Sequence, residues 1–489
     1  MTLNNIKSVQ KTVGLLLTVF SSTMLTPVVV ALIYQESTSL VFVASFLITG
    51  LFGLVLWLPA KKADTEIRLH EGFIIVASFW VVLALFGALP FLLLPELDHL
   101  SVTDAVFEST SGLTTTGATI LTGLDELPRS LLFYRQQLQW LGGLGIVVLA
   151  VALLPILGVG GGMRLYRAES ASAIKESKFT PRQKETAKAL ATIYLILTAV
   201  CVLCYNLAGM DFFDALSHGF STVAIGGFST HDTSFGFYDT SPAIHWVAVI
   251  FMFLAGINFS LHFFAWKSKS VVSYLKNTEF KTYCYLLTLV FFIAAVSIVF
   301  SNNGVKESTT ITEVLFQVVS IGTTTGYTTS AYGTWPLFVP FLLLGLSFVG
   351  GCVGSTGGGL KVVRVLLLYK QGAREIKRLI HPSAEIPVIL NGRSVDQKIL
   401  DSVWGFIAAY LAILVIMVCM LVASGLDPLT SFSAIAASLN NLGPGLGDVF
   451  ANYTVLETFP KWVCIAGMVL GRLEIFALLV LFTRAFWQE

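Results

Sequence analysis

Long apolar segments separated by short polar ones make up most of the chain. Two of them, near 13–33 and 39–59, come first and are joined by only a few polar residues. A run of about 20 apolar residues is long enough to cross a bilayer as a helix. The pattern predicts an accessory pair of transmembrane helices, and we expect the first to be retained as an anchor rather than cleaved as a signal.

The rest of the chain repeats one order four times: an apolar run, a polar segment with a glycine, and a second apolar run. The apolar runs lie near 72–94 and 131–157, 187–208 and 243–266, 282–300 and 335–368, and 400–424 and 460–486. The glycines are Gly117, Gly227, Gly326 and Gly443, spaced by 110, 99 and 117 residues. Such a repeat must be recognised before a fold is proposed. We interpret each unit as a helix, a re-entrant loop and a helix, which gives about ten spans in all.

Further positions keep the same register relative to these four glycines. Thirteen residues before them stand Asp104, Asp214, Glu313 and Thr430. Six residues before them stand Ser111, Ser221, Ser320 and Ala437. Oxygen-bearing and acidic side chains are favoured in the first turn of a helix, where the backbone amides are exposed. We therefore expect a short pore helix to begin near the first of these two positions in each repeat.

Composition agrees with a polytopic membrane protein. Of the 489 residues, 55% are hydrophobic and only 12% are charged, which argues against a soluble fold. The net charge of +1 gives no indication of a nucleic-acid partner. The six cysteines are scattered, and neither a disulfide framework nor a zinc site is indicated.

Lysine and arginine gather on one side of this topology, in the termini and in the segments between repeats. The rule that positive charge stays inside places both termini and these linkers in the cytoplasm, and the four loops outside. Thr180-Pro181-Arg182-Gln183 has a capping-box pattern that predicts a helix start. Asn391-Gly392, between two short apolar stretches, predicts a hairpin. Acidic residues near the loops, including Asp232 and Asp448, make the outer mouth attractive to cations.

The predicted organisation is all-α, with two N-terminal spans and four pseudo-fourfold repeats around one central pore. Its parts are the accessory pair at 1–70, pore repeat 1 at 71–160, a cytoplasmic linker at 161–185, pore repeat 2 at 186–270, pore repeat 3 with a broken second helix at 271–370, a linker with the hairpin at 371–398, and pore repeat 4 at 399–489. Non-helical backbone at membrane depth must be buried in protein or line a watery path. Four loops around one axis would give a ring of backbone carbonyls like that of potassium channels.

Three motifs make the chain recognisable. They are Gln139-Trp140-Leu141-Gly142-Gly143, Gly226-Gly227-Phe228-Ser229-Thr230-His231-Asp232, and Asn441-Leu442-Gly443-Pro444-Gly445. With these motifs and its four repeats, the chain resembles the Trk/Ktr/HKT superfamily of potassium transporters over essentially its whole length, most closely the bacterial TrkH/TrkG type. The resemblance implies an ion-conducting subunit that takes up potassium across the bacterial inner membrane.

The resemblance also implies which residues carry this function. Backbone carbonyls of the four loops would form a potassium filter from Thr115, Thr116, Gly117, Ile225, Gly226, Gly227, Thr324, Thr325, Gly326, Asn441, Leu442 and Gly443. Glycine in all four loops goes with potassium preference in this superfamily, whereas serine in the first loop accompanies sodium transport in some plant members. Taken alone, any one of these glycines could equally mark a tight turn.

The second helix of the third repeat is interrupted by a glycine-rich stretch that cannot be a continuous helix. By resemblance it is an intramembrane gating loop that contains Gly350, Gly351, Gly354, Ser355, Thr356, Gly357, Gly358 and Gly359. A phosphate-binding loop is disfavoured because no strand precedes the stretch and the spacing is wrong. Arg472, inside the last apolar run, is either a barrier to ions below the filter, as in relatives, or part of a structural ion pair with Glu474 or another acid.

Several alternatives stay open at this stage. The same architecture fits a sodium-permeable channel or a potassium symporter coupled to protons or sodium. An intramembrane enzyme is disfavoured because the chain has neither an HExxH nor a GxSxG motif. The resemblance further implies a homodimer on a cytoplasmic, nucleotide-binding regulatory subunit (TrkA-like). No cofactor is expected besides the transported potassium ion, and no nucleic-acid partner.

Overall fold

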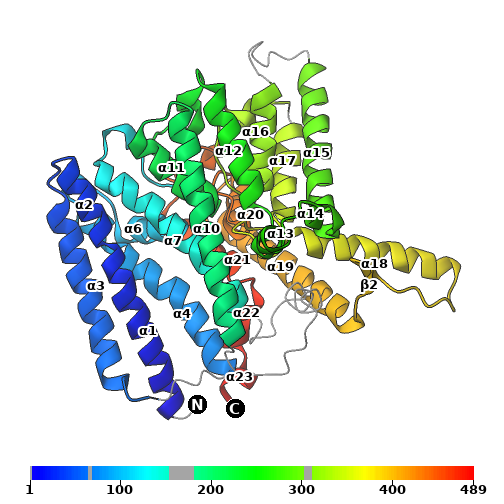
Figure 1. The fold of residues 1–489 in the computed structure, drawn as a ribbon, viewed down its shortest axis with the longest axis horizontal. Helices are drawn as coiled ribbons and strands as arrows, with labels where there is room; N and C mark the ends of the chain where they lie inside the picture. Colours follow the sequence, from blue (N-terminus) through cyan, green and yellow to red (C-terminus); the bar gives the residue numbers. More distant parts are fainter. Residues whose placement is uncertain are drawn as a thin grey trace.

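The computed structural model describes residues 3–488, with the exception of 64–68, 98, 153–180, 302–310 and 337. Helices dominate this part of the chain, and its only strands are β1 (Ile389–Leu390) and β2 (Arg393–Ser394). Figure 1 shows the helices side by side with the two termini near each other at one end. The expectation of an all-α polytopic fold is confirmed.

The first hairpin consists of α1 (Leu3–Thr23), α2 (Leu25–Ile33) and α3 (Ser39–Ala60). Two glycines let its helices approach closely. A Cβ atom added to Gly14 would lie 2.6 Å from the amide nitrogen of Trp57, and one added to Gly53 would lie 2.7 Å from that of Thr18. The hairpin is tied to the rest of the molecule by Gln137, whose Nε2 donates to the carbonyl of Thr23 at 2.9 Å.

Each of the four glycine segments follows a short helix of 12 or 13 residues, with further helices on either side of it in the sequence. Repeat 1 has α4 (Leu69–Gly87), α5 (Leu89–Leu93), the short helix α6 (Val102–Leu113) and α7 (Arg129–Ala152). Repeat 2 has α10 (Pro181–Leu207), the short helix α11 (Phe212–Ala224), α12 (Pro242–Ala255), α13 (Phe259–Ser268) and α14 (Val272–Lys276). The predicted linker at 161–185 lies outside the described residues up to position 180, and so does the predicted cap Thr180. Helix α10 begins with Pro181 at its first position.

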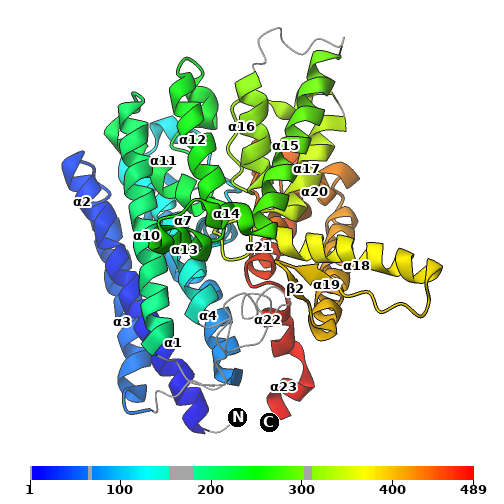
Figure 2. The same cartoon turned by 45° about the vertical axis from the view of Figure 1, so that its right-hand side comes forward.

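The last two repeats follow the same order. Repeat 3 has α15 (Thr278–Val299), the short helix α16 (Ile311–Gly322), α17 (Phe338–Val349) and α18 (Val362–Ile380), which projects away from the bundle in Figure 2. After the β1–β2 hairpin, which turns at Asn391-Gly392, repeat 4 has α19 (Gln397–Ala423), the short helix α20 (Pro428–Asn440), α21 (Thr458–Arg472), α22 (Phe476–Leu479) and α23 (Arg484–Gln488). Short 3-10 turns connect these helices at Pro95–Leu97, Leu124–Glu126, Ser234–Tyr238, Tyr332–Thr334, Gly447–Val449 and Val480–Phe482.

The four short helices begin where the repeat register predicts. Asp104, Asp214, Glu313 and Thr430 each occupy the third position of α6, α11, α16 and α20. Three of these helices are preceded by a residue whose side chain accepts a hydrogen bond from a backbone amide of the first turn. These residues are Ser101, Asp211 and Asp427. Because exposed amides attract oxygen and negative charge, the same physical signal marks the start of these three helices.

Two predicted second helices differ from the expected continuous spans. The helix axis turns by 92° between α12 and α13, and by 105° between α21 and α22. At the first turn Asn258 caps the new helix by accepting the amide of Ser260 at 2.8 Å, and at the second turn Glu474 and Ile475 both adopt φ of +53°. Neither break was predicted from the sequence, because the apolar runs continue through both of them.

Six helices in the described ranges are long and apolar enough to cross a membrane, and eight if each bent pair counts as one span. Helices α7 and α17 hold the equivalent place in repeats 1 and 3. The buried apolar side chains form three clusters. One joins the accessory hairpin with repeats 1 and 4, one joins repeat 2 with α7 and α16, and one joins repeat 3 with α20. Each repeat therefore packs on the repeats before and after it.

Candidate functional site

Four loops, one after each short helix, meet in a closed ring. We name them loop 1 (114–118), loop 2 (224–228), loop 3 (323–327) and loop 4 (440–444). Each ring glycine faces the carbonyl oxygen of the residue just before the glycine of the next loop. A Cβ atom would lie 2.2 Å from Gly226 O if added to Gly117, 2.1 Å from Thr325 O if added to Gly227, 2.0 Å from Leu442 O if added to Gly326, and 2.8 Å from Thr116 O if added to Gly443. The last contact returns to loop 1, so the order of the loops around the ring is 1, 2, 3, 4.

The four loops share one backbone conformation, although their sequences differ. The ring glycines have φ of +81°, +87°, +84° and +96°, a region that glycine enters at little cost. The residues two positions earlier are also left-handed, and they are Thr115 (+54°), Ile225 (+55°), Thr324 (+69°) and Asn441 (+51°). In a regular strand successive carbonyls point in opposite directions. Where left-handed and right-handed residues alternate along the chain, successive carbonyls point to the same side instead. The four loops therefore present one repeated backbone geometry around the ring.

Side chains behind the loops hold this conformation. In loop 1 the hydroxyls of Thr114 and Thr116 lie 2.8 Å apart, and in loop 3 those of Thr323 and Thr325 do the same. The amide of Asn441 in loop 4 donates to the Thr116 hydroxyl at 3.0 Å, so it also joins loop 4 to loop 1. All five side chains are buried. The threonines therefore support the ring from outside it.

Arg135 on α7 braces loops 1 and 2, and it is not directed toward solvent. Its Nε pairs with Glu108 of α6 at 2.8 Å, and its Nη1 donates to the carbonyl of Ser229 at 3.1 Å. The guanidinium also stacks over the ring of Phe228, 4.2 Å from its centroid. One buried cation thus connects a short helix of repeat 1 with the segment after loop 2.

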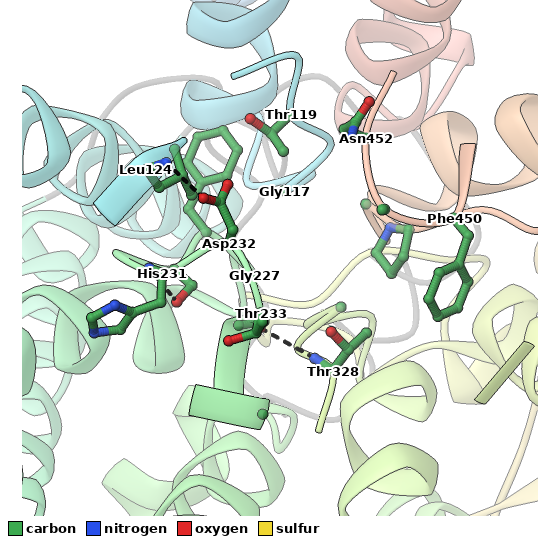
Figure 3. A pocket seen from close by; sticks show the side chains of 18 of the residues that line it. Gly117, Thr119, Leu124, Gly227, His231, Asp232, Thr233, Thr328, Phe450 and Asn452 are labelled. Atoms are coloured by element: carbon green, nitrogen blue, oxygen red, sulfur yellow. Dashed lines mark hydrogen bonds between the residues drawn. The ribbon is translucent and has the colours of Figure 1, made fainter. Parts of the chain in front are cut away.

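A cavity of about 480 Å³ opens above the ring, and all four ring glycines line it. Figure 3 shows Gly117 and Gly227 at its floor, with His231 and Asp232 on the loop 2 side. The carboxylate of Asp232 accepts the amide of Leu124 at 2.9 Å and so joins the segments that follow loops 1 and 2. With Asp239 also in its wall, this vestibule carries carboxylate oxygens and negative charge.

The glycine-rich segment 350–359 lies against the opposite side of the ring, at the C-terminal ends of α16 and α20. The amide of Gly359 donates to Asn440 O at 3.1 Å, and the amide of Gly358 donates to the Thr324 hydroxyl at 2.7 Å. A Cβ atom on Gly358 would lie 1.9 Å from Asn440 O, and one on Gly357 would lie 2.7 Å from Thr323 O. The absence of side chains therefore lets this segment press against loops 3 and 4.

The segment itself is held by cations. Arg472, which is 4% exposed, donates from Nη1 to the carbonyl of Thr356 at 3.0 Å, and its guanidinium lies over the ring of Trp80, 5.6 Å from the centroid. Its Nε and Nη2 have no hydrogen-bond partner within the described ranges. Lys361, also buried, donates to the carbonyl of Gly357. Glu474 pairs with Arg364 at 2.6 Å, which corrects the alternative of an ion pair between Arg472 and Glu474. The structure thus places Arg472 beneath the ring, against the glycine-rich segment.

A family model described as TrkH, a cation transport protein, matches residues 38–489. The chain belongs to the TrkH family. It is 49% identical over 483 residues to the Trk system potassium uptake protein TrkH of Escherichia coli K12, and 50% identical over 485 residues to that of Vibrio parahaemolyticus, with 99% of each chain covered. It is 38% identical over 490 residues to the potassium uptake protein TrkG of E. coli K12, with both chains fully covered.

The fold of this TrkH-family chain matches a solved relative. The crystal structure of the potassium transporter TrkH from V. parahaemolyticus superposes with a TM-score of 0.91 at 48% identity, covering 99% of this chain and 100% of that one. The resemblance inferred from the motifs is therefore confirmed at the level of family and fold.

The structure brings the predicted residues together in two groups, and it adds three that sequence reasoning missed. The twelve loop residues lie in the ring, and the segment 350–359 lies with Arg472 beneath it. Gln139, Lys361 and Glu108 were not assigned to the site, whereas Arg135 was expected either to reach the membrane surface or to brace a pore loop. The signal for Lys361 is a basic residue two positions after the last glycine of the run, and for Glu108 it is an acidic residue inside a predicted pore helix.

Proposed function

We propose that this TrkH-family protein is the ion-conducting subunit of a Trk-type system that takes up potassium across the bacterial cytoplasmic membrane. The single observation that carries the proposal is the closed ring, in which each loop glycine faces a carbonyl of the next loop. A ring of backbone carbonyls can replace the hydration shell of a potassium ion. The potassium uptake proteins among the relatives support the choice of ion.

The filter would consist of the backbone carbonyls of the four loops. The residues that provide it are Thr115, Thr116, Gly117, Ile225, Gly226, Gly227, Thr324, Thr325, Gly326, Asn441, Leu442 and Gly443. Their shared backbone conformation supports this role, because the same two left-handed positions recur in four loops of different sequence. The acidic vestibule above would raise the local concentration of cations at the entrance.

The segment 350–359 would act as the gate and Arg472 as a barrier in the conduction path. Direct contact of the segment with loops 3 and 4 supports a gating role at the exit from the ring. A buried guanidinium beneath it repels cations, and the bond from Arg472 to Thr356 holds the segment in place. Conduction would require this segment to move, and both cations that bond to it would then lose a partner.

The pore would lie in the membrane with both termini and a regulatory partner on the cytoplasmic side. Basic residues in the segments between repeats support a cytoplasmic location for both termini, so the vestibule would face outside. We expect a homodimer that binds a cytoplasmic, nucleotide-binding regulatory subunit, which would bias the gate. Lipid would surround the exposed apolar side chains of helices such as α3 and α15.

Potassium uptake in a bacterial strain that lacks its own uptake systems tests this function. Expression of the protein together with a regulatory subunit should restore growth at low external potassium, and the protein alone should restore less. No rescue by a protein that reaches the membrane would contradict the proposal. In liposomes, uptake that stops when a proton or sodium gradient is removed would indicate symport, whereas sodium flux equal to potassium flux would indicate a sodium-permeable channel.

A further inference from the structure

Loop 2 lacks the hydroxyl pair that supports loops 1 and 3. In those loops, threonines stand one and three positions before the ring glycine and contact each other at 2.8 Å. The same positions in loop 2 are Gly226 and Ala224. Loop 2 nevertheless adopts the same left-handed backbone, with Ile225 at φ of +55°. Since β-branched residues resist this conformation, another group must hold loop 2 in place.

A side chain from a different repeat fills the space behind loop 2. A Cβ atom added to Gly226 would lie 2.2 Å from Oε1 and 2.9 Å from Cβ of Gln139, which is on α7 of repeat 1. Gln139 is fully buried. Its amide group therefore stands where loops 1 and 3 have the side chains of Thr116 and Thr325.

Gln139 makes three hydrogen bonds there. Its Nε2 donates to the carbonyl of Gly226 at 2.7 Å, while its Oε1 accepts the hydroxyl of Ser221 at 2.7 Å and the amide of Phe228 at 3.2 Å. Loop 3 makes the corresponding link within itself, since the Ser320 hydroxyl donates to Tyr327 O at 2.7 Å. Gln139 thus connects the two ends of loop 2 and fixes the carbonyl between them.

The fixed carbonyl is the one that faces Gly117 in the ring. A carbonyl oxygen has two lone pairs, so Gly226 O can accept from Gln139 and still face an ion. Without the amide donor, this carbonyl would be free to rotate. A ring in which one carbonyl is mobile would be able to coordinate the smaller sodium ion as well as potassium.

We propose that Gln139 is a positioning residue for ion selectivity, a side chain supplied by repeat 1 that completes loop 2. The inference rests on the proposed function of the ring as a potassium filter. It predicts a reciprocal relationship between positions 139 and 226, because the two positions compete for one space. A threonine at 226 and a glutamine at 139 exclude each other, so shortening Gln139 should relieve the crowding that a threonine at 226 creates.

Three variants test this relationship in purified full-length protein reconstituted in bilayers. The measurement is the potassium-to-sodium permeability ratio, obtained from the reversal potential with potassium on one side and sodium on the other. Gln139→Ala should lower the ratio by about tenfold, since a buried carbonyl loses its donor. Gly226→Thr should also lower it, because the new side chain meets Gln139. The double variant Gln139→Ala/Gly226→Thr should be more selective than Gly226→Thr, because the crowding at position 226 is relieved.

Two further variants separate selectivity from folding. Gln139→Met keeps the volume of the side chain and removes all three hydrogen bonds, so it should fold and still lose selectivity. Gln137→Ala is the matched control: it removes a buried glutamine of the same helix whose bonds go to Thr23 and Thr26 in the accessory hairpin, and it should leave the ratio unchanged.

A selective wild type together with an unchanged ratio in Gln139→Met would overturn this inference alone. A double variant whose permeability ratio is no higher than that of the less selective single variant would also overturn this inference. A wild-type protein that conducts potassium and sodium equally would overturn the proposed function and this inference together.

Discussion

Arg135 and Glu108 form an ion pair in the interior, with Nε and Oε1 2.8 Å apart and side chains that are 1% and 0% exposed. The carboxylate of Glu108 also accepts the amide of Ile120 at 3.0 Å and the hydroxyl of Thr119 at 3.0 Å, so every charge in this network has partners. The pair joins α6 and α7 to the segments that follow loops 1 and 2. Its position suggests that it sets the distance between these loops.

Loss of either partner should destabilise the protein strongly. Removing one member of a buried pair leaves the other charge uncompensated, at a cost of roughly 3–5 kcal/mol. Arg135→Met and Glu108→Leu should each lower the thermal unfolding temperature in detergent. The double variant should be less destabilised than either single one, because no lone charge remains. A double variant as unstable as the sum of both changes would contradict this account.

A side chain at the first ring glycine should reduce potassium selectivity. In Gly117→Ser the new Cβ atom would meet Gly226 O at 2.2 Å, and φ is +81°. We expect the permeability ratio of potassium to sodium to fall by about tenfold, which corresponds to about 1.4 kcal/mol. Gly123→Ser is the matched control, because Gly123 also has a positive φ, +70°, but nothing lies within 4 Å of its Cβ position. Equal effects of both variants would indicate backbone strain rather than crowding in the ring.

A side chain at position 358 should displace the glycine-rich segment from the ring and so increase ion flux. Gly358→Ala would bring a methyl group to 1.9 Å from Asn440 O, so the segment can no longer rest against loop 4. We expect potassium flux into liposomes to rise several-fold in the absence of a regulatory subunit. Gly345→Ala, in α17 of the same repeat, has open space around its Cβ position and should leave the flux unchanged. A Gly358→Ala protein that folds and conducts less than wild type would contradict the gating role.

The wall of the vestibule should be stabilised by a proton on His231. Its ring contacts Asp125 at 2.5 Å and Asp214 at 3.1 Å. Burial opposes the charged ring, but the hydrogen bonds to Asp214 and Asp125 outweigh burial and raise the pKa of His231. Because the folded-state pKa is raised, the stabilisation is fully present below the unfolded-state value of about 6.5 and is lost as pH rises through the folded-state pKa.

The unfolding temperature measured from about pH 5.5 to about pH 8.5 checks this sign. The wild-type protein should lose stability as the pH rises through this range, and His231→Gln should lose less. A variant whose unfolding temperature falls with pH as steeply as that of the wild type would show that another group titrates.

The repeat register allowed much of the fold to be predicted from sequence. Polar side chains at helix starts and glycines at a fixed offset are local signals, so the four short helices and their loops could be located. The bends before Asn258 and after Arg472 could not, because the apolar runs continue through them. Ile225 gives no local sign of a left-handed backbone, since its conformation depends on neighbours far away in sequence. The role of Gln139 likewise depends on a partner 87 residues away.

The reversal potential of the wild-type protein in a planar bilayer, with potassium on one side and sodium on the other, tests the central claim most directly. A ring of carbonyls that fits potassium predicts a potential close to the potassium equilibrium value, and a loss of that preference in Gly117→Ser but not in Gly123→Ser. A potential near zero in the wild type, with cation current present, would contradict the account.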